Sequence, residues 1–143
     1  MQTSGGFMSK VSVEYGKGIR LLSKMEGKNQ EIVTDAPKSI GGKEEFVSPT
    51  DLLCMALGSC VLTMMGMIAE QSGIDLTGTR AEVQKTYNGA QIGSLHVEIF
   101  VERELDERAI TRLEKAGKMC PVHNAIGSNV EHTITFHWKK ASV

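Results

Sequence analysis

Alternation of apolar and polar side chains recurs along the chain and predicts β-strands. It is clearest at residues 93–103, where the aliphatic residues from Leu95 to Val101 face one way and polar residues face the other. The Tyr87-Asn88-Gly89 run before this segment is typical of a hairpin turn. The predicted strands are residues 11–15, with Val11, Val13 and Tyr15 on one face, and residues 19–25, 30–34, 77–87, 93–103 and 129–138.

A long helix is predicted from Ser48 to about Ser72. Ser48 is a good N-cap, Pro49 suits the first helical position, and Asp51 is an acid three residues after the cap. Nearly every side chain between Leu52 and Ala69 is apolar, so we expect this helix to be buried on most sides. Its length also reaches the lower limit of a membrane span. Acids rather than Lys or Arg flank it, and we therefore expect no membrane.

A second helix is predicted from its cap Asp106 to Met119, followed by a helical turn over residues 121–127. Residues 35–47 show no period and predict a long loop of the kind that often carries function. The order βββ-α-ββ-α-β indicates an α+β fold without a parallel βαβ repeat. We expect one domain over residues 1–143, with residues 1–8 as a flexible N-terminal extension.

Charge and composition exclude some classes of function. Sixteen Lys and Arg residues against 17 Asp and Glu residues give a net charge of −1, and the basic residues are scattered, so no nucleic-acid partner is expected. The first residues contain no apolar stretch of signal-peptide length, which favours the cytoplasm. In that reducing compartment the three cysteines are expected to be thiols, and any disulfide is expected to be transient.

The cysteines are the candidate reagents. Cys54 and Cys60 lie six residues apart on one predicted helix, a rise of about 9 Å, so they cannot bridge each other. Cys120, at a helix break, could pair with either of them. The polar neighbours Ser59 and Thr63 favour Cys60 as the reactive thiol, and we expect Cys54 to be a small core residue. A thiol in an apolar helix reacts only when a cation lies nearby.

Two segments resemble a known family. SPTDLLCMALGSC, residues 48–60, and CPVHNAIG, residues 120–127, are similar to the two signatures of the OsmC/Ohr family of osmotically inducible and organic hydroperoxide resistance proteins. The resemblance implies an intertwined homodimer in which antiparallel sheets wrap around long central helices. It also implies a peroxidatic Cys60, a resolving Cys120, no bound cofactor, and an external dithiol reductant such as a lipoyl-type dithiol.

One position departs from the family pattern. Members that reduce organic peroxides well carry an Arg near the start of the chain and a Glu directly after the Pro of the helix-start motif. Here that second position is Thr50, which cannot form an ion pair with arginine. Asp51, Glu44 and Glu45 are nearby substitutes. Arg20 is the candidate for the cation that activates the thiol.

The spacing of Thr50 and Cys60 has a geometric consequence. Ten residues correspond to about 15 Å along a helix, so these two side chains cannot meet within one subunit. If two copies of the helix cross antiparallel near Met55, position 50 of one faces position 60 of the other. We therefore expect the site at a homodimer interface, with Ala56 and Gly58 small enough to permit close approach.

Three hypotheses follow. The leading one is a cytoplasmic peroxidase for oxidative stress defence, which reduces organic hydroperoxides to alcohols through a Cys60 sulfenic acid and a Cys60–Cys120 disulfide. The second is a non-catalytic OsmC-like protein that senses redox state or binds an apolar ligand. The third is a metal-binding module that uses Cys60, Cys120 and His123, because Cys120 and His123 have a C-x-x-H spacing. Most methionines are expected in the core; if Met64, Met65 and Met67 line a pocket beside Cys60, that pocket favours alkyl hydroperoxides over hydrogen peroxide.

Overall fold

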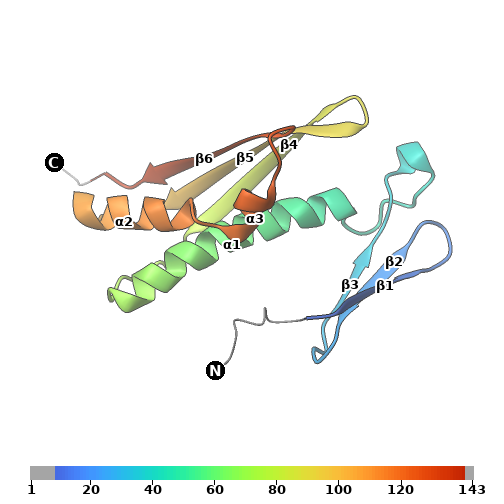
Figure 1. Cartoon of the computed structure of the whole chain (residues 1–143), viewed down its shortest axis with the longest axis horizontal. Coiled ribbons are helices and arrows are strands. Elements are labelled where there is room, and N and C mark those ends of the chain that lie inside the picture. The colour runs from blue at the N-terminus through green and yellow to red at the C-terminus, as the bar shows by residue number, and fades with distance from the viewer. Residues whose placement is uncertain (1–8, 141–143) are drawn as a thin grey trace, which may run out of the picture. The chain divides into compact units, whose positions relative to one another are not determined.

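A computed structural model describes residues 9–140, so the predicted extension over residues 1–8 lies outside the described residues. The elements follow the predicted order βββ-α-ββ-α-β, with a short helix before the last strand, and confirm the α+β class (Figure 1). The chain divides into two compact units, Met1–Leu52 and Leu53–Val143. The elements are β1 (Val11–Tyr15), β2 (Leu21–Met25), β3 (Glu31–Thr34), the 3-10 turn η1 (Lys38–Ile40), α1 (Pro49–Gln71), β4 (Arg80–Asn88), β5 (Gln91–Val101), α2 (Glu107–Gly117), α3 (Pro121–Ala125) and β6 (Glu131–Trp138).

The first unit is an antiparallel sheet of order β1-β2-β3 followed by the long loop. Its buried residues within the described range are Thr34, Asp35 and Ala36, at the end of β3 and the start of the loop. The apolar residues of β1 share one face, as the alternation predicts, but they are exposed by 58 to 68%. This sheet therefore buries little apolar surface of its own.

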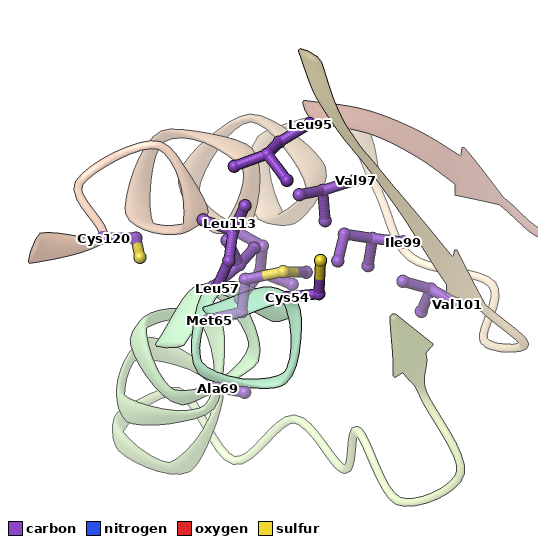
Figure 2. Packing of buried hydrophobic residues seen from close by; sticks show 11 residues of the cluster. Cys54, Leu57, Met65, Ala69, Leu95, Val97, Ile99, Val101, Leu113 and Cys120 are labelled. Atoms are coloured by element: carbon purple, nitrogen blue, oxygen red, sulfur yellow. The ribbon is translucent and has the colours of Figure 1, made fainter. Parts of the chain in front are cut away.

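The second unit has a core between α1, α2 and the β4-β5-β6 sheet. Both helices lie on one face of this sheet (Figure 1). Leu57 and Met65 of α1 point toward the aliphatic side chains of β5, and Leu113 of α2 completes the cluster (Figure 2). Burying each such side chain contributes about 1.5–3 kcal/mol, so this cluster dominates the stability of the unit. The predicted inward residues of β5 are all buried: Leu95, Val97, Ile99 and Val101.

The described residues cover only one side of α1, although the composition predicted burial on most sides. Met55 and Met67 are each 52% exposed, on the side away from the buried residues. By length and composition α1 could cross a membrane, a test that the core helix of a soluble protein also meets. Gly58 faces β4 instead of the exposed side: a Cβ there would lie 3.1 Å from Val83 Cγ2. The close approach that Gly58 permits is therefore to its own sheet.

The pairing in the second sheet corrects one expectation. β4 and β5 form the predicted antiparallel hairpin, with Gly89 at a φ of 63° in its turn. β5 and β6 are parallel, with Leu95 opposite His132, so the expectation of purely antiparallel sheets is wrong for this pair of strands. Parallel neighbours need a long connection, and the segment through α2 and α3 provides it. Alternation fixes which face a side chain takes but leaves the strand direction open.

Candidate functional site

The structure brings two of the predicted site residues together. Cys60 lies on α1 and is partly exposed, whereas Cys120 directly precedes α3 and is fully buried. Both are free thiols, and their side chains share a hydrogen bond. Cys54 belongs to the buried core instead, as expected for a small apolar residue (Figure 2). Of the two partners that the sequence left open for Cys120, the structure places Cys60 beside it.

Cys120 is held by the short helix that follows it. Pro121 occupies the first helical position, and the Cys120 Sγ accepts the backbone N–H of His123 at 3.2 Å. Burial, and then the hydrogen bond with Cys60, raise the pKa of the Cys120 thiol, and the backbone N–H groups of His123 and Val122 offset this in part. Because the pKa is raised, Cys120 is a protonated thiol at neutral pH.

A histidine pair lies behind this turn. The ring of His123 meets the ring of His132 edge-on, with 4.5 Å between the ring centroids. Burial, and then the neighbouring His132, lower the pKa of His123, so its imidazole is neutral at neutral pH. Within residues 9–140, no group of three or more His, Cys, Asp or Glu side chains is placed to hold a metal ion. The geometry therefore does not support a metal site at Cys60, Cys120 and His123.

Arg20 of the first unit lies in a cluster of its own. Its Nη2 donates to Asp35 Oδ2 at 3.0 Å and to Glu45 Oε2 at 2.6 Å. Its guanidinium also stacks on the Phe46 ring, with 4.7 Å from Cζ to the ring centroid. Glu45 is one of the substitutes that the sequence proposed for the family glutamate. Asp35 was missed, because a single acid at the start of a loop carries no motif.

The charges of this cluster stabilise each other. The hydrogen bonds from Arg20 to Glu45 and Asp35 raise the pKa of the guanidinium further. Burial alone raises the pKa of Asp35, but the hydrogen bond from Arg20 and those from the backbone N–H groups of Glu45, Ala36 and Lys43 outweigh it and lower that pKa to about 2. Arg20 and Asp35 are both charged at neutral pH.

One donor of Arg20 has no acceptor. The Nε atom is buried, and no residue in the described range accepts a hydrogen bond from it. Buried donors are normally paired, so this atom is available to an acceptor that the described residues do not supply. An open depression next to Arg20 is lined mainly by apolar residues of the sheet, among them Leu22 and Val33.

The other predicted supporting residues shape the start of α1 and the loop. Ser48 N donates to Asp51 Oδ2 at 2.9 Å, and Asp51 N donates to Ser48 Oγ at 3.2 Å, which is the predicted capping box. The Thr50 hydroxyl lies 3.0 Å from Ser48 Oγ. Glu44 accepts a hydrogen bond from the backbone N–H of Lys38 in the loop. In these contacts Thr50, Asp51 and Glu44 hold local structure, whereas Glu45 contacts Arg20.

The fold is mixed α+β, with one thiol on a long helix and a neighbouring thiol at a helix break. Residues 42–135 match the family model described as OsmC-like protein. The chain therefore belongs to the OsmC-like family, as the resemblance predicted. No curated protein sequence matches it.

Solved structures agree with this assignment. A crystal structure from Psychrobacter arcticus, whose name refers to osmotic stress induction and a detoxification response, is 33% identical, with a TM-score of 0.84 over 94% of this chain and 100% of that one. An organic hydroperoxide resistance protein from Elizabethkingia anophelis is 19% identical, with a TM-score of 0.71 over 96% of this chain and 100% of that one. OhrB of Bacillus subtilis is 16% identical, with a TM-score of 0.63 over 92% and 98% of the two chains. The last two show a shared fold.

Proposed function

We propose that this protein is a thiol-dependent peroxidase that reduces organic hydroperoxides to alcohols in oxidative stress defence. The observation that carries the proposal is the contact between Cys60 and Cys120, two free thiols from distant parts of the chain. Core cysteines rarely need a second thiol, whereas a sulfenic acid that must be resolved does. Membership of a family with organic hydroperoxide resistance proteins as structural neighbours supports the same function.

The chemistry follows the ordinary oxidation steps of cysteine. The Cys60 thiolate attacks one oxygen of the hydroperoxide, the O–O bond breaks, and the alkoxide leaves as an alcohol after taking up a proton. Cys60 is then a sulfenic acid. The Cys120 thiol attacks that sulfur, a disulfide forms, and the hydroxyl leaves as water with the thiol proton. An external dithiol, such as a lipoyl-type dithiol, reduces the disulfide by exchange and is itself oxidised. No bound cofactor is needed for these steps.

We assign the activating charge to Arg20. Its guanidinium contacts two carboxylates, yet its buried Nε still lacks an acceptor among the described residues. A thiolate is an acceptor of the required charge, and a neighbouring cation lowers the pKa of a thiol. The apolar depression beside Arg20 suits an alkyl group better than water, which favours organic over inorganic peroxide.

We also propose that the protein acts as a cytoplasmic homodimer. Apolar residues stay exposed on one face of β1 and on one side of α1, including Val11, Val13, Met55 and Met67. A second copy of the chain that covers these residues removes their apolar surface from water. Light scattering after gel filtration is expected to give twice the 15.6 kDa mass of the chain, and a monomer at micromolar concentration would contradict the dimer.

The central experiment measures product and disulfide together. The reduced protein is treated with cumene hydroperoxide and dihydrolipoamide, cumyl alcohol is quantified, and disulfides are mapped by mass spectrometry. With dithiol we expect many equivalents of alcohol. Without dithiol we expect one equivalent and a Cys60–Cys120 disulfide. Cys60→Ser is expected to abolish turnover, Cys120→Ser to stop it after one equivalent, and the matched control Cys54→Ala to retain it. Equal rates with hydrogen peroxide would contradict the preference for organic substrates.

A second function is favoured by one observation. Thr50 stands where efficient family members have a glutamate, and its hydroxyl contacts Ser48 at the helix start. A protein that senses redox state, or binds an apolar ligand, would keep the two thiols in contact without efficient turnover. Stoichiometric oxidation of Cys60 with no further alcohol, in the presence of dithiol, is the result that this alternative predicts.

A further inference from the structure

The carboxylate of Asp35 has more partners than an ion pair requires. Its Oδ1 accepts the backbone N–H groups of Ala36 at 2.9 Å and Lys43 at 3.4 Å. Its Oδ2 accepts the Glu45 N–H at 3.1 Å and Arg20 Nη2 at 3.0 Å. The side chain is fully buried. A buried carboxylate with both oxygens occupied keeps a single orientation, and among the described residues the Arg20 guanidinium balances its charge.

Asp35 also closes the long loop. Its own backbone N–H donates to Val47 O at 3.0 Å, and its side chain reaches Lys43 and Glu45 across the loop. Glycine is required at position 42, because a Cβ there would lie 1.8 Å from the backbone oxygen of Ala36. The closed loop carries Glu45 and Phe46 to Arg20, so the carboxylate that fixes the loop also fixes everything that touches the guanidinium.

The two carboxylates that meet Arg20 differ in their surroundings. The Glu45 side chain is 57% exposed and that of Asp35 is 0% exposed. An exposed ion pair contributes little, because water screens it and the side chains lose entropy when they meet. A buried pair with its remaining lone pairs satisfied holds its geometry much more strictly. The short Glu45 contact is therefore the dispensable one.

The residue directly before Arg20 has a strained backbone. Ile19 has a φ of 59°, in the left-handed region that a β-branched residue avoids. Such strain persists only where neighbouring contacts hold it, and it concentrates at functional sites. Here the Gly16 N–H donates to Arg20 O at 2.7 Å, and the ion pair with Asp35 holds the other end of the residue.

We infer that Asp35 is the positioning residue for Arg20: it holds the guanidinium and the 35–47 loop so that the Nε donor points at the acceptor it serves. This inference rests on the proposed function, in which that acceptor is the Cys60 thiolate of a second copy of the chain. Asp35 touches neither the thiol nor the peroxide in this role and acts only through Arg20. Glu45 adds a contact to the same guanidinium without determining its position.

The test compares Asp35→Asn with the matched control Glu45→Gln, since each removes one charge from an Arg20 partner and keeps its size. Two quantities are measured: kcat/KM for cumene hydroperoxide, and the pH midpoint of Cys60 alkylation by iodoacetamide, read by mass spectrometry. Asp35→Asn is expected to lower kcat/KM on the order of 10- to 100-fold, as misplaced groups do, and to move the midpoint to higher pH. Glu45→Gln is expected to change kcat/KM by less than about threefold.

Arg20→Met separates failure of this inference from failure of the proposed function. If Arg20→Met and Asp35→Asn have equal effects and the double variant loses no more, Asp35 acts through Arg20. If Arg20→Met raises the midpoint but Asp35→Asn behaves like Glu45→Gln, the positioning role is overturned and the peroxidase stands. If Arg20→Met leaves the midpoint unchanged, the assignment of the cation is overturned, and the role of Asp35 with it. Should Asp35→Asn fail to fold by circular dichroism, Asp35→Glu replaces it and is expected to shift the midpoint in the same direction.

Discussion

Adding a methyl group at Gly117 is expected to push α2 away from α1 close to the two thiols. Gly117 is buried at the last position of α2, three residues before Cys120. A Cβ there would lie 3.2 Å from Phe136 Cζ, 3.3 Å from Met65 Cγ and 3.3 Å from Val61 Cγ1. Val61 directly follows Cys60, so the crowding falls between α1 and α2 beside the site. Gly117→Ala therefore perturbs the site without touching either sulfur.

The magnitude follows from two opposing effects. Carbon atoms pack best at about 3.5–4.0 Å, so three neighbours must each move by a few tenths of an ångström, and overpacking of this kind costs about 1–3 kcal/mol. Alanine gains up to about 1 kcal/mol over glycine in a helix. The net loss for Gly117→Ala is about 1 kcal/mol. At Gly66 of α1 a Cβ meets nothing within 4 Å, so Gly66→Ala gains the propensity alone.

Urea unfolding of the two variants tests the packing argument. The free energies of unfolding should differ by about 2 kcal/mol, with Gly117→Ala below the wild type and Gly66→Ala above it. Stopped-flow oxidation with one equivalent of cumene hydroperoxide tests the site. Gly117→Ala should oxidise Cys60 at the wild-type rate but form the Cys60–Cys120 disulfide more slowly. Equal stabilisation by both substitutions, or an unchanged disulfide rate, would refute this account of how α2 places Cys120.

Three further predictions concern stability. Leu57→Ala should lower the free energy of unfolding by about 2–5 kcal/mol in urea, because Leu57 is 0% exposed in the core; a loss below 1 kcal/mol would contradict that packing. The folded-state pKa of Asp35, about 2, lies below its ordinary value of 3.8. Its contribution to the free energy of unfolding is therefore present above pH 4 and is lost as pH falls toward 2. Asp35→Asn should remove this part of the pH dependence of urea midpoints. The pKa of His123 is lowered from 6.5, so the free energy of unfolding should decrease as pH falls below that value, because unfolding lets the ring take up a proton. His123→Gln should flatten the plot of this free energy against pH. A slope identical to that of the wild type would contradict the buried neutral imidazole.

Elements with a strong local signal were predictable. Ser48, Pro49 and Asp51 placed the start of α1 correctly, because a capping box is determined by residues within one turn. The inward face of β5 was also correct, since strict alternation leaves only one way to bury its aliphatic residues. The site benefited likewise: Cys120 and Cys60 each lie in a recognisable motif, and the structure brings these motifs into contact.

Features that depend on contacts far apart in the chain were not predictable. Asp35 meets Arg20 across 15 residues, and no spacing rule marks such a pair in a loop. The direction of β6 relative to β5 depends on how the α2 connection crosses the sheet, and the alternation in β6 is the same for either direction. Gly58 was expected from its size to permit close approach of a second copy of the helix, whereas it faces its own sheet, and that direction depends on the strand that packs there.

The different burial of the two thiols also orders the proposed reaction. Cys60 is partly exposed, so a hydroperoxide can approach it, whereas Cys120 has no exposed surface and a raised pKa. A buried, protonated thiol is a poor target for peroxide but keeps its sulfur unoxidised until the neighbouring sulfenic acid forms. The contact between the sulfurs then makes resolution intramolecular, with a high effective concentration. If Cys120 of the Cys60→Ser variant were oxidised by peroxide at a rate near that of Cys60 in the wild type, this order would be wrong. Burial would then not be what separates the two roles.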